Sequence, residues 1–227
     1  MTALLTLNDV SMQFSREADS QYAVFEEINL TVGAGECVAL VGRNGSGKST
    51  LLRVMAKIFA PTSGTVCWAP GVAVSLLTLG LGFRPDLSGR DNAFLSCLLM
   101  GLSRNEAKGA LGDIEAFCEL GEFFDQPVNH YSAGMRARLG FGTALMNRSQ
   151  VVLIDETLSV GDAFFREKAR VALEQEFNAQ RAVVLVSHAE QQVERLCDRA
   201  ILLEQGKITA EGYPRDVLSA YRDLTAK

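Results

Sequence analysis

The stretch Gly42-Arg43-Asn44-Gly45-Ser46-Gly47-Lys48-Ser49-Thr50 decides the fold of this chain. It follows an apolar run at residues 37–41 and leads into residues 51–55, which have the composition of a helix. A strand, a glycine-rich turn and a helix in this order form a phosphate cradle, because backbone N–H groups can surround an anion where no Cβ intrudes. The helix N-terminus adds unpaired donors and a positive dipole end. We therefore expect Lys48 to reach the terminal phosphates and the Ser49 hydroxyl to bind Mg²⁺.

The composition of the chain indicates which classes of protein can contain this loop and which are excluded. The chain has 227 residues, of which 48% are hydrophobic, enough for one large α/β domain. The net charge of -5 provides no basic excess for nucleic acid or for an anionic membrane surface. The five cysteines are scattered, which fits a reducing cytosol. No signal peptide and no apolar run of about 18 residues is present, so we expect a soluble chain without direct membrane insertion.

The remaining pattern predicts an α/β fold with a parallel sheet, an antiparallel β part and an inserted helical subdomain. Strands are predicted at residues 4–10, 28–32 and 65–68, with a helix after the phosphate loop that runs to about Phe59. Residues 84–147 change to helical character and interrupt the strand–helix alternation. We therefore predict a nucleotide-binding core of residues 1–83 and 148–227, with residues 84–147 as the inserted subdomain.

Further elements are predicted after the inserted block. Apolar strands at residues 151–154 and 183–186 are expected to be buried on both faces, as in a parallel sheet. Residues 187–190 have the pattern of a capping box that begins a helix. A hairpin is predicted at residues 200–210, and Pro214 fits the first turn of a last helix.

Polar side chains follow the predicted parallel strands at the edge where such sheets bind ligands. Asp155 and Glu156 end one strand, and Ser187 and His188 end the next. Asp155 is expected to hold Mg²⁺, directly or through water. Glu156 is expected to polarise the water that attacks a γ-phosphate, and His188 to contact that phosphate.

Five motifs together resemble those of ABC ATPases. Residues 42–50 form a Walker A motif, and residues 151–156 resemble a Walker B motif followed by its catalytic glutamate. Residues 131–135 resemble the signature motif, residues 158–162 the D-loop, and residues 186–188 the switch histidine. This resemblance covers nearly the whole chain in the family's order. It implies ATP and Mg²⁺ as ligands and ATP hydrolysis as the activity.

The signature stretch predicts a second anion site. Ser132 is a plausible N-cap, which would leave the N–H groups of Ala133 and Gly134 at a helix start. In the family this site completes the ATP site of a partner subunit. The resemblance therefore implies that two copies of the chain sandwich two ATP molecules.

Other stretches resemble one branch of the family, the ATPases that export O-antigen, capsule or teichoic acid polysaccharides. They are residues 79–83, 85–92, 123–128, 132–136 and 159–163. The resemblance implies the short form of this branch, a transmembrane permease as partner, and a peripheral location on the cytoplasmic face of the plasma membrane. A soluble or regulatory ABC ATPase that is not coupled to transport remains the alternative.

Two features depart from the family pattern. There is no glutamine between Gln21 and Gln126, so the Q-loop glutamine is missing, and Arg84 is near its place. The aromatic residue expected to stack on adenine is also ambiguous. Phe14 is the first choice and Tyr22 the second, and either could be core packing.

Overall fold

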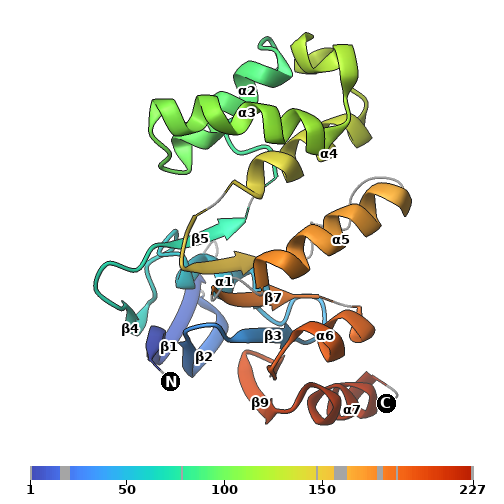
Figure 1. The fold of residues 1–227 in the computed structure, drawn as a ribbon. Coiled ribbons are helices and arrows are strands. Elements are labelled where there is room, and N and C mark those ends of the chain that lie inside the picture. Colours follow the sequence, from blue (N-terminus) through green and yellow to red (C-terminus); the bar gives the residue numbers. More distant parts are fainter. Residues whose placement is uncertain are drawn as a thin grey trace. The chain divides into compact units, whose positions relative to one another are not determined.

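The N-terminal part of the chain forms an antiparallel sheet. The computed structural model describes residues 2–15, 21–77, 79–146, 148–155, 163–177, 181–187 and 189–225. Its first sheet has three strands in the order β2-β1-β4, namely β1 (Ala3–Ser15), β2 (Gln21–Gly33) and β4 (Ser63–Trp68) (Figure 1). The predicted strands are present, but β1 and β2 are much longer than residues 4–10 and 28–32.

Two bulges explain why the pattern predicted strands that are too short. Asp9 and Glu27 have positive φ angles of 47° and 53°, and the register between β1 and β2 shifts beside them. The Asn29 side chain accepts a hydrogen bond from the Asp9 N–H (2.9 Å) and donates to the Asp9 carboxylate (2.8 Å). A bulge breaks the period-two alternation while the strand continues, so the sequence pattern ends before the strand does.

The second sheet has six strands in the order β5-β6-β7-β3-β8-β9. Their bounds are β3 (Cys37–Val41), β5 (Val74–Leu77), β6 (Val151–Ile154), β7 (Ala182–Val186), β8 (Arg199–Glu204) and β9 (Lys207–Gly212). Strands β6, β7, β3 and β8 are parallel, and β9 pairs antiparallel with β8. Every residue of β3, β6 and β7 is buried, which confirms the predicted parallel strands covered on both faces.

Helix α1 (Lys48–Met55) is shorter than predicted. Lys57 has a left-handed φ of 56°, and the Ile58 N–H donates to the Arg53 carbonyl at 2.9 Å. A left-handed residue followed by such a bond closes the end of a helix. The prediction that α1 runs to about Phe59 is therefore wrong.

Two further helices complete this part of the chain, α6 (Glu190–Leu196) and α7 (Pro214–Thr225). The predicted start of α7 at Pro214 is confirmed. The predicted capping box at Ser187 is wrong, because α6 begins after Ala189 without a side-chain cap. The Ser187 hydroxyl instead accepts a hydrogen bond from the Ala189 N–H at 3.1 Å, a local turn that competes with capping.

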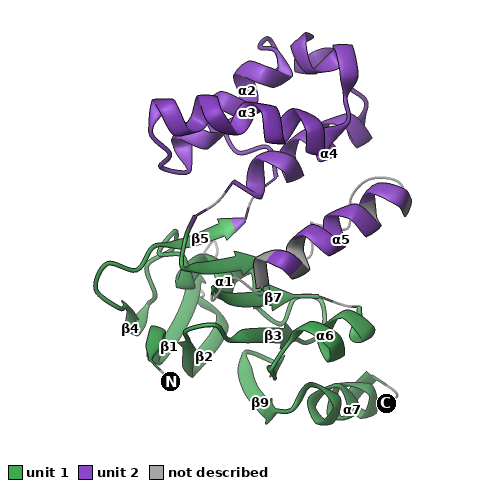
Figure 2. Ribbon diagram, in the orientation of Figure 1, with its two compact units in different colours: residues 1–76, 149–156, 176–227 green, residues 77–148, 157–175 purple. Residues whose placement is uncertain are grey.

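Contacts divide the chain into two compact units, coloured in Figure 2. Unit 1 comprises residues 1–76, 149–156 and 176–227, and unit 2 comprises residues 77–148 and 157–175. In unit 1 a single apolar cluster joins both sheets and α1. Its members include Leu5, Phe25, Leu40, Leu51, Leu153 and Val184, all of which are buried.

Unit 2 is helical. It contains α2 (Gly89–Leu99), α3 (Arg104–Cys118), α4 (Ala133–Ala144) and most of α5 (Ala163–Phe177), with short 3₁₀ helices η1 (Gly121–Asp125) and η2 (Val128–His130). Ser103 and Glu106 form a capping box at the start of α3. Phe117, Phe141 and Phe165 join α3, α4 and α5, with ring centroids 5.7–6.0 Å apart.

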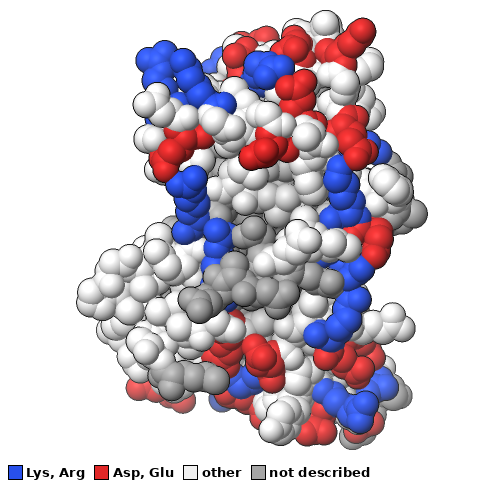
Figure 3. All heavy atoms as spheres, viewed as in Figure 1, with Lys and Arg blue, Asp and Glu red and all other residues white. Residues whose placement is uncertain are grey.

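Both signs of charge are present on the surface of the described residues. Figure 3 shows that, on the visible face of each unit, Lys and Arg side chains lie among Asp and Glu side chains. Among the described residues, no helix combines the length and the apolar character needed to cross a membrane.

The two sheets and the helical unit together make an α/β fold, with a largely parallel sheet, an antiparallel sheet and a helical unit, as predicted.

Candidate functional site

The loop between β3 and α1 needs glycine at two points. Gly42 has a φ of 152°, and a Cβ on it would lie 2.1 Å from the backbone oxygen of Leu203. Gly47, the N-cap of α1, has a φ of 102°, and a Cβ on it would lie 3.1 Å from a methyl group of Val24. L-residues rarely adopt these conformations, so neighbouring strands and backbone angles together require the glycines.

The side chain of Lys48 is only 7% exposed and lies inside this loop. Its ammonium group donates to the carbonyl oxygens of Gly42 (2.7 Å) and Arg43 (2.8 Å). The hydroxyl of Ser46 is buried and has no hydrogen-bond partner among the described residues. The loop therefore contains a buried cation and a buried hydroxyl without a partner, which suits the binding of an anion because buried polar groups need partners.

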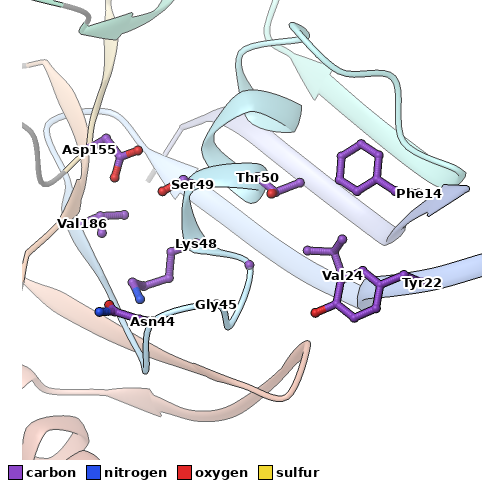
Figure 4. A pocket seen from close by; sticks show the side chains of 11 residues that line it. Phe14, Tyr22, Val24, Asn44, Gly45, Lys48, Ser49, Thr50, Asp155 and Val186 are labelled. Atoms are coloured by element: carbon purple, nitrogen blue, oxygen red, sulfur yellow. The ribbon is translucent and has the colours of Figure 1, made fainter. Parts of the chain in front are cut away.

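A pocket of about 450 Å³ opens on the loop (Figure 4). Its wall comes from β1, β2, the phosphate loop, α1 and the ends of β6 and β7, through Phe14, Tyr22, Val24, Asn44, Gly45, Gly47, Lys48, Ser49, Thr50, Asp155 and Val186. In Figure 4, Ser49 and Asp155 lie at one side and the rings of Phe14 and Tyr22 at the other. The pocket therefore has a polar end and an aromatic end.

The polar end brings together the two residues predicted to bind Mg²⁺. Ser49 is the second residue of α1, and Asp155 directly follows β6. A hydroxyl and a carboxylate are oxygen ligands of the kind that Mg²⁺ prefers. The observed residues fit the ion, although they come from elements about 100 positions apart in the chain.

Both aromatic candidates lie at the other end of the pocket. Phe14 in β1 and Tyr22 in β2 are cross-strand partners, 40% and 43% exposed respectively. Each ring is therefore accessible to a ligand. The sequence prediction left the choice between them open, and the position of both in the pocket wall is compatible with either.

The pocket wall also contains two residues that the sequence pattern did not identify as site residues. Val24 and Val186 belong to its wall. Val186 ends β7 directly before Ser187, so its place at the ligand-binding edge could have been inferred. Nothing in the pattern of β2 distinguishes Val24 from its neighbours.

The predicted second anion site has the expected local structure. Ser132 is the N-cap of α4, and its hydroxyl accepts a hydrogen bond from the Met135 N–H at 3.2 Å. Ala133 and Gly134 are the first two residues of the helix. Tyr131 is buried beside them and its hydroxyl donates to the Phe123 carbonyl at 2.6 Å. These contacts anchor the start of α4 within unit 2.

Some of the predicted site residues are not among the described residues of the pocket wall. Glu156, His188 and the D-loop at residues 158–162 lie outside the described residues. Arg84, considered in place of the missing glutamine, lies in unit 2, where its guanidinium is 3.4 Å from the carboxylate of Asp86. Their roles stay predictions.

The glycine loop, the buried lysine and the strand-end carboxylate define a P-loop nucleotide-binding domain. A profile of the ABC transporter family matches residues 25–159, more than half of the chain. The chain therefore belongs to the ABC transporter family, as an ATPase domain that binds nucleotide. The predicted family resemblance is confirmed.

The chain is also similar in sequence to ATP-binding proteins of export systems. The chain is 40% identical over 206 residues to the O-antigen export system ATP-binding protein RfbB of Klebsiella pneumoniae, covering 91% of this chain and 83% of the relative. It is 42% identical to a protein of the same name from Myxococcus xanthus, covering 92% of this chain and 47% of that one. It is 35% identical to the teichoic acids export ATP-binding protein TagH of Shouchella clausii, covering 92% and 58%.

Solved structures confirm the fold. An ATP-binding subunit of an ABC transporter superposes with a TM-score of 0.82 at 22% identity, covering 99% of this chain and 100% of that one. An ATP-binding cassette solved as a dimer with ADP and phosphate gives a TM-score of 0.77 at 22% identity, covering 93% and 99%. At this level of identity the likeness concerns the fold alone.

Proposed function

We propose that this chain is the ATP-hydrolysing subunit of a transporter that exports a cell-surface polysaccharide through a separate transmembrane subunit. The observation that carries the proposal is the identity of 40–42% over about nine tenths of the chain to proteins named for O-antigen export. The pocket supports the ATPase part, because it offers a lysine for the phosphates of ATP and a hydroxyl and a carboxylate for the accompanying Mg²⁺. The location proposed is the cytoplasmic face of the plasma membrane, through the permease.

The residues of the polar end would act mainly by position and charge. Lys48 would exchange its two carbonyl partners for phosphate oxygens of ATP. Ser49 and Asp155 would hold Mg²⁺, which when bound would offset the charge on the phosphates. Glu156 would accept a proton from the attacking water, and His188 would contact the γ-phosphate. The last two roles rest on the sequence motifs.

The second anion site supports a dimer as the working state. Ser132, Ala133 and Gly134 begin α4 in unit 2, whereas the phosphate loop belongs to unit 1. We propose that the start of α4 in one copy completes the ATP site of a second copy. On this view residues 84–147 are the signature subdomain, inserted into a nucleotide-binding core of residues 1–83 and 148–227. The related cassette solved as a dimer supports this arrangement by its fold.

An export assay tests the proposal. Cells whose chromosomal copy carries Glu156→Gln should lose the surface polysaccharide and accumulate the polymer inside, because transport stops while synthesis continues. Glu122→Gln, at an exposed acid of η1, is the matched control and should export normally. If Glu156→Gln cells display normal surface polymer, the chain is not the export ATPase. A soluble or regulatory role would then be the better explanation.

A further inference from the structure

Phe59, which is not part of the pocket wall, packs against Phe14 at the aromatic end of the pocket. The rings of Phe14 and Phe59 meet edge to face, with centroids 5.8 Å apart and planes at 85°. Phe14 belongs to the pocket wall and is 40% exposed, while Phe59 is half-buried. Edge-to-face packing is a favoured arrangement of two aromatic rings. Phe59 therefore contacts a ring whose exposed part belongs to the pocket.

The turn after α1 puts Phe59 in this position. The N–H groups of Ile58 and Phe59 both donate to the carbonyl of Arg53, at 2.9 Å and 3.2 Å. The guanidinium carbon of Arg53 also lies 5.9 Å from the centroid of the Phe59 ring. The early end of α1, which the sequence pattern did not predict, thus determines where this ring lies.

Two hydrogen bonds hold the following segment against β1. The Thr62 N–H donates to the Ser11 carbonyl at 2.8 Å, and the Thr62 hydroxyl accepts from the Gln13 N–H at 2.9 Å. The segment that carries Phe59 is therefore fixed at both ends, to α1 and to the strand that carries Phe14. Helix α1 also carries Lys48 and Ser49. Residues 48–62 therefore connect the residues expected to bind the phosphates and Mg²⁺ with the aromatic end of the pocket.

We propose that Phe59 is a positioning residue for the nucleobase: it holds the Phe14 ring so that one face stays open to the pocket, where the base stacks. The inference rests on the proposed function, in which this pocket binds ATP, and chooses Phe14 over Tyr22. A ring near the end of a strand would otherwise exchange rotamers. Packing against Phe59 selects one orientation before the ligand arrives, which reduces the entropy lost on binding.

The test compares two ligands that differ in the base. On this proposal Mg·ATP would contact both ends of the pocket, whereas Mg·tripolyphosphate, which has no base, would contact the phosphate loop alone. Phe59→Leu keeps apolar volume and removes the aromatic ring, so ATP affinity should fall by about three- to tenfold with tripolyphosphate affinity unchanged. Phe14→Ala should weaken ATP by about 5- to 150-fold, the usual contribution of a stacked base. Calorimetric titration of the full chain measures both.

Controls separate positioning from general damage. Phe59→Tyr keeps the ring and should restore ATP affinity, and Ile58→Ala, at a neighbouring side chain that is 58% exposed, should leave it unchanged. In a Phe14→Ala background, Phe59→Leu should have no further effect, because Phe59 acts through Phe14. Equal losses for ATP and tripolyphosphate in Phe59→Leu would show a merely structural role and overturn the inference. So would independent effects of the two substitutions, or a loss on Tyr22→Ala with none on Phe14→Ala.

The same titrations distinguish this inference from the proposed function. A wild-type chain that binds ATP tightly while Phe59→Leu binds it equally well overturns the positioning role alone. A wild-type chain that binds neither ATP nor tripolyphosphate overturns nucleotide binding, and with it the inference.

Discussion

The ammonium nitrogen of Lys48 lies 2.7 Å from the carbonyl oxygen of Gly42, the residue that begins the phosphate loop. A second carbonyl, that of Arg43, accepts from the same group at 2.8 Å. The lysine thus stabilises the loop by closing it with its own side chain. Carbonyl oxygens carry partial charge, so phosphate oxygens with full negative charge are stronger partners for the same donor.

Lys48→Ala should therefore weaken Mg·ATP binding by about 100-fold, since charge-assisted hydrogen bonds to phosphate are lost. Lys108→Ala, which removes an exposed lysine of α3 outside the phosphate loop, is the matched control, and we expect no change in affinity. Titration with a fluorescent ATP analogue measures both. Unchanged affinity in folded Lys48→Ala would contradict the assignment of the phosphate loop.

Glu156→Gln should separate binding from hydrolysis. The amide keeps the size of the side chain and removes the proton acceptor, so turnover should fall by about 10²–10⁴ while ATP affinity holds or tightens. Single-turnover assays on the folded fraction measure the rate. Light scattering of the same variant should show the mass doubling with Mg·ATP if two copies share the sites. A normal hydrolysis rate would exclude Glu156 as the general base.

Two glycine substitutions should have opposite effects on stability. Gly42→Ala puts a Cβ 2.1 Å from a backbone oxygen at a φ of 152°, so the free energy of unfolding should fall by about 2 kcal/mol or more. Gly109→Ala, within α3 and with nothing within 4 Å of the added Cβ, should raise it by about 0.5–1 kcal/mol. Urea denaturation of both variants gives the values. A Gly42→Ala variant as stable as wild type would disprove the close contact between the loop and β8.

The capping box of α3 should make stability depend on acid pH. Hydrogen bonds with Ser103, and then the Arg148 guanidinium, lower the pKa of Glu106 to about 2. Because the pKa is lower in the folded state, this stabilisation is fully present above the unfolded pKa of about 4.3 and is lost as the pH falls toward 2. Denaturation at pH 7, 4 and 3 should show the gap between wild type and Glu106→Gln narrowing. Glu122→Gln is the matched control, and a gap that stays constant with pH would refute the capping role.

Local features of this protein could be predicted from the sequence alone. The phosphate loop, the buried strands β3, β6 and β7, and the cap at Ser132 depend on neighbours within a few residues, so their residue types are sufficient evidence. The family motifs placed Asp155 in the site in the same way. Glu156 and His188 were identified from the same motifs and stay predictions.

Only the tertiary structure decided how distant segments meet. The bulges at Asp9 and Glu27 lengthen β1 and β2 beyond the sequence pattern, because each depends on the partner strand. The contact between Phe14 and Phe59 joins residues 45 positions apart in the chain. It follows from the early end of α1, which no local propensity indicates. Side chains far apart in sequence come together only after both sheets and α1 have packed on one core, and that packing is what gives the pocket its aromatic end.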